Sequence, residues 1–140
     1  MSTNSKTYEI LRKSVEDFGK GDLEGYLSAF TPDAVVSVFG IPFEPAIPFW
    51  HKFDKARADN LDESQSTLDL YDLVVGEKRG FELFHVVDVH RDGRKTLYDM
   101  CVIVELDAET GKIKKYQVFT EDMEVINMYR GWYKAVSGRA

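Results

Sequence analysis

The second half of the chain most constrains its fold, because residues 67–121 carry four strand patterns in close succession. The ranges 67–75, 81–90, 94–106 and 112–121 are rich in β-branched and aromatic residues, and the turn sequences GEKRG, RDGR and ETG separate them. Strands that follow one another through such short turns pair antiparallel. This half of the sequence therefore predicts an antiparallel meander.

The first half of the chain predicts helices. Apolar residues recur at helical spacing over 6–19, and Asp22 is placed to cap a second short helix that starts at Leu23. A β-branched segment at 34–39 predicts one strand. Together with the meander, these elements predict an α+β fold in which a curved antiparallel sheet wraps around N-terminal helices.

The segment GIPFEPAIPFWHKF, residues 40–53, is apolar and contains three prolines. Proline is excluded from helix interiors and central strands, so we expect an apolar loop that folds over the core. A short helix is expected at 54–61, and a last helix is expected after Asp122, its candidate N-cap. The length of 140 residues predicts one domain, residues 1–140.

The hairpin at Asp92–Gly93 decides which face each neighbouring strand residue occupies. A DG pair is typical of a two-residue turn, and that turn pairs His85 with Met100 and Val87 with Tyr98. The expected concave, helix-covered face then carries Phe81, Leu83, His85, Val87, Val89, Tyr98, Met100, Val102 and Val104. The expected outer face carries Glu82, Phe84, Val86, Asp88, His90, Leu97, Asp99, Cys101 and Ile103. A slip of one residue would exchange the faces.

The second hairpin contains ETG at 109–111, which predicts a three-residue loop with glycine in the left-handed conformation. This register places Glu105 opposite Lys115 and Val102 opposite Val118. The first pair is a favourable cross-strand charge pair, and the second keeps the inner face apolar.

Two histidines and an aspartate lie within the strand sequence FHVVDVH, residues 84–90. His85 and Asp88 are three positions apart, so a regular strand directs them to opposite faces, and no metal site is expected. Asp88 and His90 are expected to face outward. His85 is the only ionisable residue between the hairpin ends on the expected inner face, where an imidazole serves either as a general acid or base or as a hydrogen-bonded core histidine.

The charge and the cysteine count exclude several classes of protein. The net charge of −6 and the pI of about 5.1 argue against a nucleic-acid partner, because phosphates repel an acidic surface. No run of eighteen apolar residues is present, so no membrane span is expected. Cys101 is the only cysteine, and the start of the sequence has no apolar signal-peptide core. These features predict a soluble cytoplasmic protein.

The local sequence resembles a known superfamily over about residues 7–122. FGKGDLEGYLSAFTPDAVVSVFG, the proline-aromatic IPFWHKF and GRKTLYDMCVIVELDAETGKIKKYQVFTED are similar to segments of SnoaL-like, nuclear-transport-factor-2-like proteins. The resemblance implies a cone-shaped cavity between sheet and helices, and a C-terminal helical extension at 123–140. It also implies that an enzyme of this type works by acid–base chemistry without a metal or organic cofactor.

The resemblance argues against an ordinary ketosteroid isomerase. The isomerase's tyrosine on the first helix would fall near Ser14, and its basic aspartate near Ser37 or Val38. Its protonated aspartic acid would fall at Val102, a position that the family directs into the cavity. None of the three functional side chains is present.

Several side chains remain as candidates for function. We expect His85 and Tyr98 to be catalytic, and we expect a ligand to bind Trp50, His51, Met100, Val102, Tyr116 and Thr120. The leading hypothesis is an acid–base enzyme of isomerase, dehydratase or cyclase type acting on an apolar metabolite. The alternatives are a non-catalytic domain that binds a hydrophobic ligand and a dimerisation domain with a filled cavity.

The expected outer face predicts an oligomer. Its row Phe84–Cys101–Phe119 is more apolar than a fully solvated surface, and contiguous apolar patches mark interfaces. We therefore expect a homodimer formed through the outer face of the sheet, as is common in the superfamily.

Overall fold

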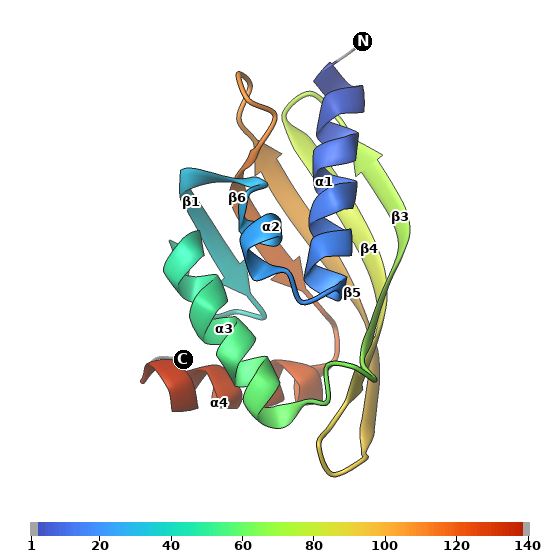
Figure 1. The fold of residues 1–140 in the computed structure, drawn as a ribbon. Helices are drawn as coiled ribbons and strands as arrows, with labels where there is room; N and C mark the ends of the chain where they lie inside the picture. The colour runs from blue at the N-terminus through green and yellow to red at the C-terminus, as the bar shows by residue number, and fades with distance from the viewer. Residues whose placement is uncertain (1–2, 139–140) are drawn as a thin grey trace.

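A six-stranded curved sheet with helices on one side forms the molecule (Figure 1). The computed structural model describes residues 3–138, with side chains from residue 6 onward. The elements, in chain order, are α1 Thr3–Gly19, α2 Leu23–Leu27, β1 Phe30–Val38, β2 Glu44–Pro45, α3 Ala46–Asn60, β3 Thr67–Val75, β4 Arg79–Val89, β5 Lys95–Leu106, β6 Ile113–Phe119 and α4 Met123–Ser137.

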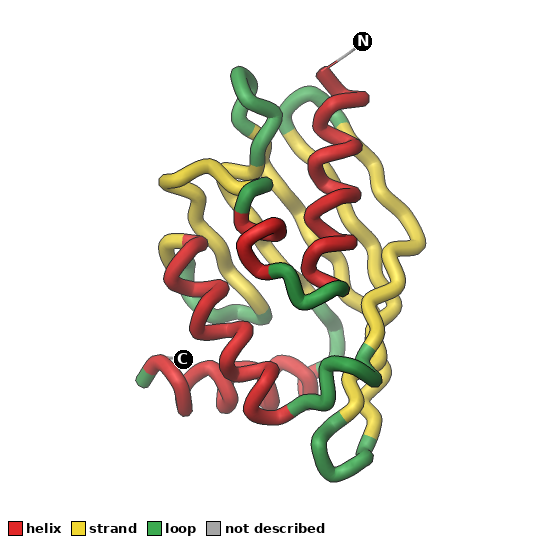
Figure 2. Tube along the Cα trace, in the orientation of Figure 1, coloured by secondary structure: helices red, strands yellow, loops and turns green. Residues whose placement is uncertain are grey.

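The strand order is β2-β1-β6-β5-β4-β3. Figure 2 shows the helices gathered on one side of the strands, with α4 crossing below α3. The predicted α+β class, the curved sheet, the N-terminal helices and the last helix are confirmed. One detail differs, because β1 pairs parallel with β6, so the sheet is mixed rather than wholly antiparallel.

The two predicted N-caps are present. Asp22 accepts a hydrogen bond from the Gly25 backbone N–H at 2.9 Å and starts α2. Asp122 accepts from the backbone N–H groups of Glu124 and Val125 at 3.0 and 3.2 Å and starts α4. Each carboxylate satisfies donors that the first helical turn leaves unpaired.

The prediction of one loop over residues 40–53 is wrong, because α3 begins at Ala46 and runs to Asn60. Pro45 occupies the N-cap position, and Pro48 lies in the first turn, where the backbone N–H has no acceptor within the helix. Neither proline breaks a helical hydrogen bond. The helix expected at 54–61 is the second half of α3.

The predicted register of the β4–β5 hairpin is wrong by one residue. His85 pairs with Asp99, and Phe84 pairs with Met100. The loop has three residues, 91–93, with Gly93 at a φ of 92°, and the Gly93 N–H donates to the His90 carbonyl at 2.9 Å. Three-residue hairpin loops use glycine in this way, so the DG pair fits them as well as a two-residue turn.

The shifted register exchanges the two faces of β4 and leaves β5 as predicted. The buried residues of β4 are Gly80, Glu82, Phe84, Val86 and Asp88, all but Gly80 of which were expected to face outward. Phe81, Leu83, His85, Val87 and Val89 lie on the outer face. On β5, Tyr98, Val102 and Val104 are buried and Met100 is half-buried, as expected.

The β5–β6 strands have the predicted register from Cys101 to Glu105, but the predicted three-residue loop is wrong, because the register shifts after Glu105 and Leu106 pairs with Ile113. Val102 pairs with Val118, and Glu105 pairs with Lys115, whose ammonium lies 3.5 Å from the Glu105 carboxylate. Gly111 has the expected positive φ of 73°. These strands therefore place their side chains on the faces that the sequence predicts.

Aromatic packing joins α4 to α3. Phe53 stacks on Tyr129 with ring centroids 5.3 Å apart, and Phe49 lies 4.8 Å from Tyr133. Tyr129 and Tyr133 are both almost fully buried. The last helix is thus part of the core. None of the helices described here is long and apolar enough to cross a membrane.

Candidate functional site

An internal space of about 50 Å³, called the cavity here, lies between the helices and the sheet. Every helix and most of the strands contribute to it. Its lining is mainly aromatic and includes Phe18, Tyr26, Phe39, Trp50, Phe53, Phe84, Tyr98, Tyr116 and Tyr129. An enclosed space with this lining suits an apolar, ring-containing molecule.

Four of the predicted site residues line the cavity: Trp50, Tyr98, Met100 and Tyr116. Val102 is fully buried in the core nearby but is not part of the lining. The structure therefore brings together half of the predicted site.

Two other predicted ligand-binding residues lie on the surface. The His51 side chain is half exposed, and its Nε2 lies 3.8 Å from the Glu24 carboxylate. Thr120 is half-buried, and its hydroxyl donates to the Asp99 carbonyl at 2.8 Å. Neither residue lines the cavity.

The expectation that His85 faces the cavity is wrong, because the one-residue shift places it on the outer face. Its side chain is 54% exposed, and its Nδ1 lies 2.6 Å from Asp99 Oδ1. The imidazole stacks on Tyr71 with ring centroids 4.0 Å apart. His85 thus belongs to the solvent-facing side of the sheet.

The expectation that Asp88 and His90 face outward is wrong for the same reason. Asp88 is fully buried, and His90 is 6% exposed. Asp88 Oδ2 accepts hydrogen bonds from the hydroxyls of Tyr98 at 2.8 Å and Tyr129 at 2.6 Å. His90 Nε2 lies 2.7 Å from the Thr96 hydroxyl, apart from this pair.

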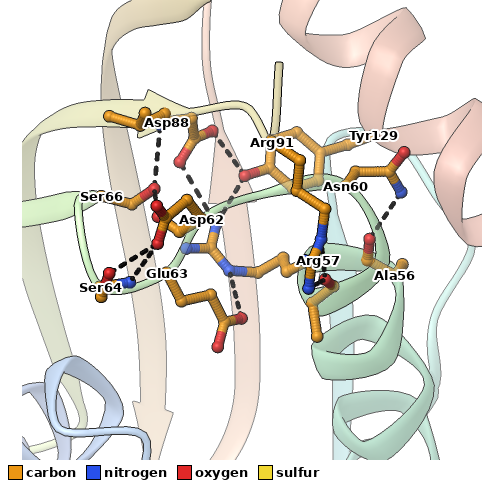
Figure 3. Close-up of polar contacts among 12 residues, drawn as sticks. Ala56, Arg57, Asn60, Asp62, Glu63, Ser64, Ser66, Asp88, Arg91 and Tyr129 are labelled. Carbon is orange, nitrogen blue, oxygen red and sulfur yellow. Dashed lines mark hydrogen bonds and ion pairs between the residues drawn. The ribbon is translucent and has the colours of Figure 1, made fainter. Parts of the chain in front are cut away.

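Arg57 completes a buried polar group with Asp88, Tyr98 and Tyr129, which we call the Asp88 network. Its guanidinium donates from Nη1 to the Tyr129 hydroxyl at 2.6 Å, and the same nitrogen lies 3.5 Å from Asp88 Oδ1 (Figure 3). Burial lowers the pKa of Arg57, but the Tyr129 and Asp88 oxygens outweigh burial and raise it overall. The guanidinium is therefore charged at neutral pH.

The two tyrosines of the Asp88 network are neutral donors. Burial, reinforced by the Asp88 charge, raises the pKa of Tyr98 well above its ordinary value. Burial likewise raises the pKa of Tyr129 above its ordinary value, although Arg57 opposes the change. Both tyrosines line the cavity, and each donates its single O–H proton to Asp88, so a ligand oxygen would accept from them only after they turn from the carboxylate.

A second polar cluster contains Glu82, Tyr116 and Tyr26. Glu82 is 1% exposed, and neither of its carboxyl oxygens has a hydrogen-bond partner among the described residues. Burial raises the pKa of Glu82 to about 8, while the nearby Tyr116 hydroxyl acts in the opposite direction. Glu82 is therefore mostly a neutral carboxylic acid at pH 7.

Two buried donors also lack partners. Within the described part of the chain, Trp50 Nε1 and Arg57 Nε have no hydrogen bond, although Arg57 Nε lies 4.0 Å from Glu63 Oε1. Buried polar groups are almost always paired, and both residues line the cavity. A bound molecule with acceptor oxygens would satisfy them.

A polar hollow of about 230 Å³, called the vestibule here, adjoins the cavity. Phe18, Arg57 and Leu68 line both spaces. The vestibule is also lined by Lys20, Asp54, Glu63, Ser64, Ser66 and Thr67, and Figure 3 shows Glu63, Ser64 and Ser66 beside Arg57. Arg57 thus stands at the boundary between an apolar interior and a polar exterior.

No group of three or more His, Cys, Asp or Glu side chains within the described residues is placed to hold a metal ion.

Solved structures of very different sequence share this architecture. An NTF2-like protein of unknown function from Burkholderia pseudomallei is 18% identical, and the match covers 92% of this chain and 98% of that one, with a TM-score of 0.74. A candidate polyketide cyclase from Xanthomonas campestris pv. campestris is 16% identical over 91% and 99% of the two chains, with a TM-score of 0.75. The chain has the NTF2-like fold.

A third solved structure matches almost the whole length of this chain. PrhC from Penicillium brasilianum is 14% identical over 98% of this chain and 95% of its own, with a TM-score of 0.74. No family model matches the sequence, and no curated protein matches it. Identities of this size establish the fold, whereas activity depends on the residues of each site.

The candidate functional residues that the sequence missed are Arg57 and Tyr129, which line the cavity, and Glu82 and Asp88, which are buried beside it. Glu82 and Asp88 were assigned to the outer face by the two-residue turn. Arg57 follows Phe49, Trp50 and Phe53 at helical spacing, so a helix starting at Ala46 would have placed it on the buried face. Tyr129 shares helical spacing with Ile126 and Tyr133, which predicts a buried position, but nothing local to it indicates a carboxylate partner.

Proposed function

We propose that the protein is a cofactor-independent acid–base enzyme that moves a proton on an apolar, cyclic, carbonyl-bearing compound. The observation that carries this proposal is the Asp88 network. A fully buried carboxylate accepts hydrogen bonds from two tyrosines beside a guanidinium, and the tyrosines and the arginine, though not Asp88 itself, line an aromatic cavity. Such clusters of buried ionisable groups in a cavity are more common at functional sites than elsewhere.

The network contains the two kinds of group that proton transfer at carbon requires. A carbon next to the carbonyl gives its proton to the Tyr98 oxygen as the Tyr98 hydroxyl proton passes to Asp88, which lies behind the cavity lining, and the C–H electron pair becomes the enolate. Once Asp88 is protonated, the hydroxyls of Tyr98 and Tyr129 turn from its Oδ2 and donate hydrogen bonds to the enolate oxygen, which the Arg57 charge also stabilises. Return of the proton to a different carbon gives the isomer, with no net change in protons.

The size of the cavity limits how the substrate is held. A volume of about 50 Å³ is far below the 300 Å³ or more of a typical small-molecule site, so the ligand must also occupy the vestibule. The apolar rings then lie against Trp50 and Phe53, and a polar end lies beside Arg57. The similarity to a candidate polyketide cyclase supports a cyclic, oxygenated substrate.

A second candidate function is non-catalytic binding of a hydrophobic ligand. The observation in its favour is that Asp88 already has its hydrogen bonds within the protein, so the network also serves to hold α3, β4, β5 and α4 together. This alternative and the enzyme share the cavity but differ in whether Asp88 exchanges a proton with the ligand.

Solvent isotope exchange separates the two functions. 2-Tetralone, a bicyclic aryl ketone, is mixed with the protein in D₂O, and loss of its α-proton signals is followed by NMR. We expect the wild type to accelerate exchange and Asp88→Asn to lower the rate by about 100-fold or more, because the base is lost. Binding followed by tryptophan fluorescence should change by no more than about threefold.

Each alternative outcome has a definite meaning. Binding of 2-tetralone without accelerated exchange contradicts the enzyme and supports the binding protein. Acceleration that survives Asp88→Asn removes Asp88 from the reaction. Absence of both binding and exchange contradicts a ligand site for cyclic ketones in this cavity.

We also propose a homodimer formed through the outer face of the sheet, in the cytoplasm. Phe84 is not part of that face, but Tyr71, Leu97 and Phe119 are, and each is 47% exposed or more. A groove of about 580 Å³ runs beside Tyr71 and Phe119. Exposed apolar side chains gathered in this way favour a protein partner.

A further inference from the structure

Glu82 is the least expected polar residue of the core. It lies on the inner face of β4, six positions and roughly 20 Å of strand from Asp88. It is 1% exposed, and within the described residues neither carboxyl oxygen has a hydrogen-bond partner. A buried polar group without a partner costs free energy, so its presence requires a reason other than stability.

The groups around Glu82 connect it to the cavity. Tyr116 on β6 and Tyr26 on α2 line the cavity, and the pKa of each is raised, chiefly by burial and also by Glu82. Cys101 on β5 is affected by Glu82 in the same direction. Burial and the Tyr116 hydroxyl are the influences on Glu82 itself, and no described charged side chain contributes.

Tyr116 links Glu82 to the cavity, because Tyr116 lines the cavity and its hydroxyl acts on the Glu82 carboxyl group. Glu82 is not part of the cavity lining, whereas Tyr116 and Phe84, two positions along β4, both are. Any influence of the carboxyl group on a ligand must therefore pass through the Tyr116 hydroxyl or follow a small movement of that side chain.

We propose that Glu82 is a positioning residue of the cavity, a neutral carboxylic acid that supplies a proton through the Tyr116 hydroxyl to an oxygen of the bound molecule. This inference rests on the proposed function, because it names the second titratable group of the same cavity. It also specifies the substrate further: the compound carries a second oxygen at the end of its ring system that is remote from Arg57.

The proton count of the step is balanced. The Tyr116 O–H proton moves to the ligand oxygen, and the Glu82 O–H proton moves to the Tyr116 oxygen. The ligand oxygen gains one proton, Tyr116 is unchanged, and Glu82 becomes a carboxylate. Reversal of the same transfers when the proton leaves the ligand restores the acid, so no further reactant is needed.

The arrangement gives two carboxyl groups different roles through their surroundings. Asp88 lies beside a guanidinium and two hydroxyl donors, which stabilise a carboxylate and suit a base. Glu82 has an apolar environment, which favours the protonated form and suits an acid. Pairs of titratable groups with opposed environments mark the acid and the base of a proton-transfer site.

NMR titration of the full-length protein tests the state of Glu82 without any ligand. Glutamate labelled with ¹³C at the side-chain carboxyl is incorporated, and the Glu82 signal is assigned by its loss in Glu82→Gln. We expect this signal to titrate with a midpoint near 8, and Tyr116→Phe to raise the midpoint further. A midpoint below 6 in the wild type would overturn the proposal.

The pH dependence of α-proton exchange in decalin-2,6-dione, a bicyclic diketone with an oxygen at each end of its ring system, tests the role in proton transfer. The wild-type rate should fall as pH rises through the Glu82 midpoint, because the acid form is lost. This fall should be absent in Glu82→Gln and retained in Glu105→Gln, the matched control at the half-buried cross-strand pair with Lys115. A fall that persists unchanged in Glu82→Gln would contradict the proposal.

The two tests separate failure of this inference from failure of the proposed function. If exchange depends on Asp88 but its pH profile does not depend on Glu82, the Glu82 role alone is wrong. If the wild type does not accelerate exchange, the proposed function and the Glu82 role both fail. The NMR titration then reports only the protonation state of the Glu82 side chain.

Discussion

At the scale of single residues, Glu82 and Asp88 show that one strand holds two buried carboxyl groups in different conditions. Asp88 has hydroxyl and guanidinium partners, and Glu82 has none among the described residues. In the folded protein the pKa of Glu82 is raised from 4.5 to about 8 by burial. A raised pKa means that the folded state holds this proton more tightly than the unfolded state.

The stability of Glu82→Met should therefore differ from that of the wild type in a pH-dependent way. Below pH 4.5 both states of the wild type are protonated, and the stabilising effect of the bound proton is complete. As pH rises to about 8, only the unfolded state ionises, so the wild type loses up to about 5 kcal/mol relative to the variant.

Urea unfolding of both proteins at a series of pH values measures this difference. At pH 7 we also expect Glu82→Met to be the more stable protein, by about 1 to 3 kcal/mol, because an unpaired polar group leaves the core. A stability difference that stays constant between pH 4.5 and 8 would show that Glu82 ionises freely in the folded protein.

At the scale of elements, the register of the β4–β5 hairpin decides the site. The observed register buries Phe84, at 2% exposure, and leaves Phe81 40% exposed. Phe84→Ala should lower the free energy of unfolding by about 3 to 5 kcal/mol, because a large buried side chain is lost. Phe81→Ala, the matched variant three positions away, should cost about 1 kcal/mol or less.

Denaturant unfolding measures both variants. The alternative register, with a two-residue turn, exchanges the two environments, so a larger loss from Phe81→Ala than from Phe84→Ala would contradict the structure.

Most helices and strands were predictable from the sequence. The prediction was wrong where one sequence pattern is compatible with two local structures. The RDG segment suits a two-residue turn and a three-residue loop alike, because both use Gly93. Strand β4 has apolar residues on both faces, such as Leu83 and Phe84, so hydrophobic alternation did not choose between them. The prolines in 40–53 led to the prediction of a loop where α3 begins. By contrast, the Glu105–Lys115 pair and the Asp122 cap were predictable from local chemistry.

At the scale of the whole molecule, the fold was predictable because helix, loop and strand patterns occur in the order that the NTF2-like fold requires. The cavity was less predictable, because Arg57, Asp88, Tyr98 and Tyr129 come from four separate elements. Only the packing of α3 and α4 against the sheet brings them within hydrogen-bonding distance.

The exposed apolar residues on the outer face of the sheet lead to a prediction about the oligomeric state of the protein. Light scattering at micromolar concentration should give twice the chain mass of 16.0 kDa for the wild type. Phe119→Asp should give the monomer, because a charge in an apolar interface is left without a partner. Lys52→Asp, a charge change on α3 at an exposed position, is the matched control and should remain dimeric. A wild-type monomer at this concentration would contradict the dimer.

The central claim is that proton transfer occurs at Asp88 beside the cavity, and one comparison tests it most directly. The rate of 2-tetralone exchange is measured side by side for Asp88→Asn and for His85→Gln, a change on the opposite face of the same strand. The account predicts a loss of about 100-fold or more for Asp88→Asn and a wild-type rate for His85→Gln. Loss of exchange in His85→Gln, with the wild-type rate kept in Asp88→Asn, would contradict it.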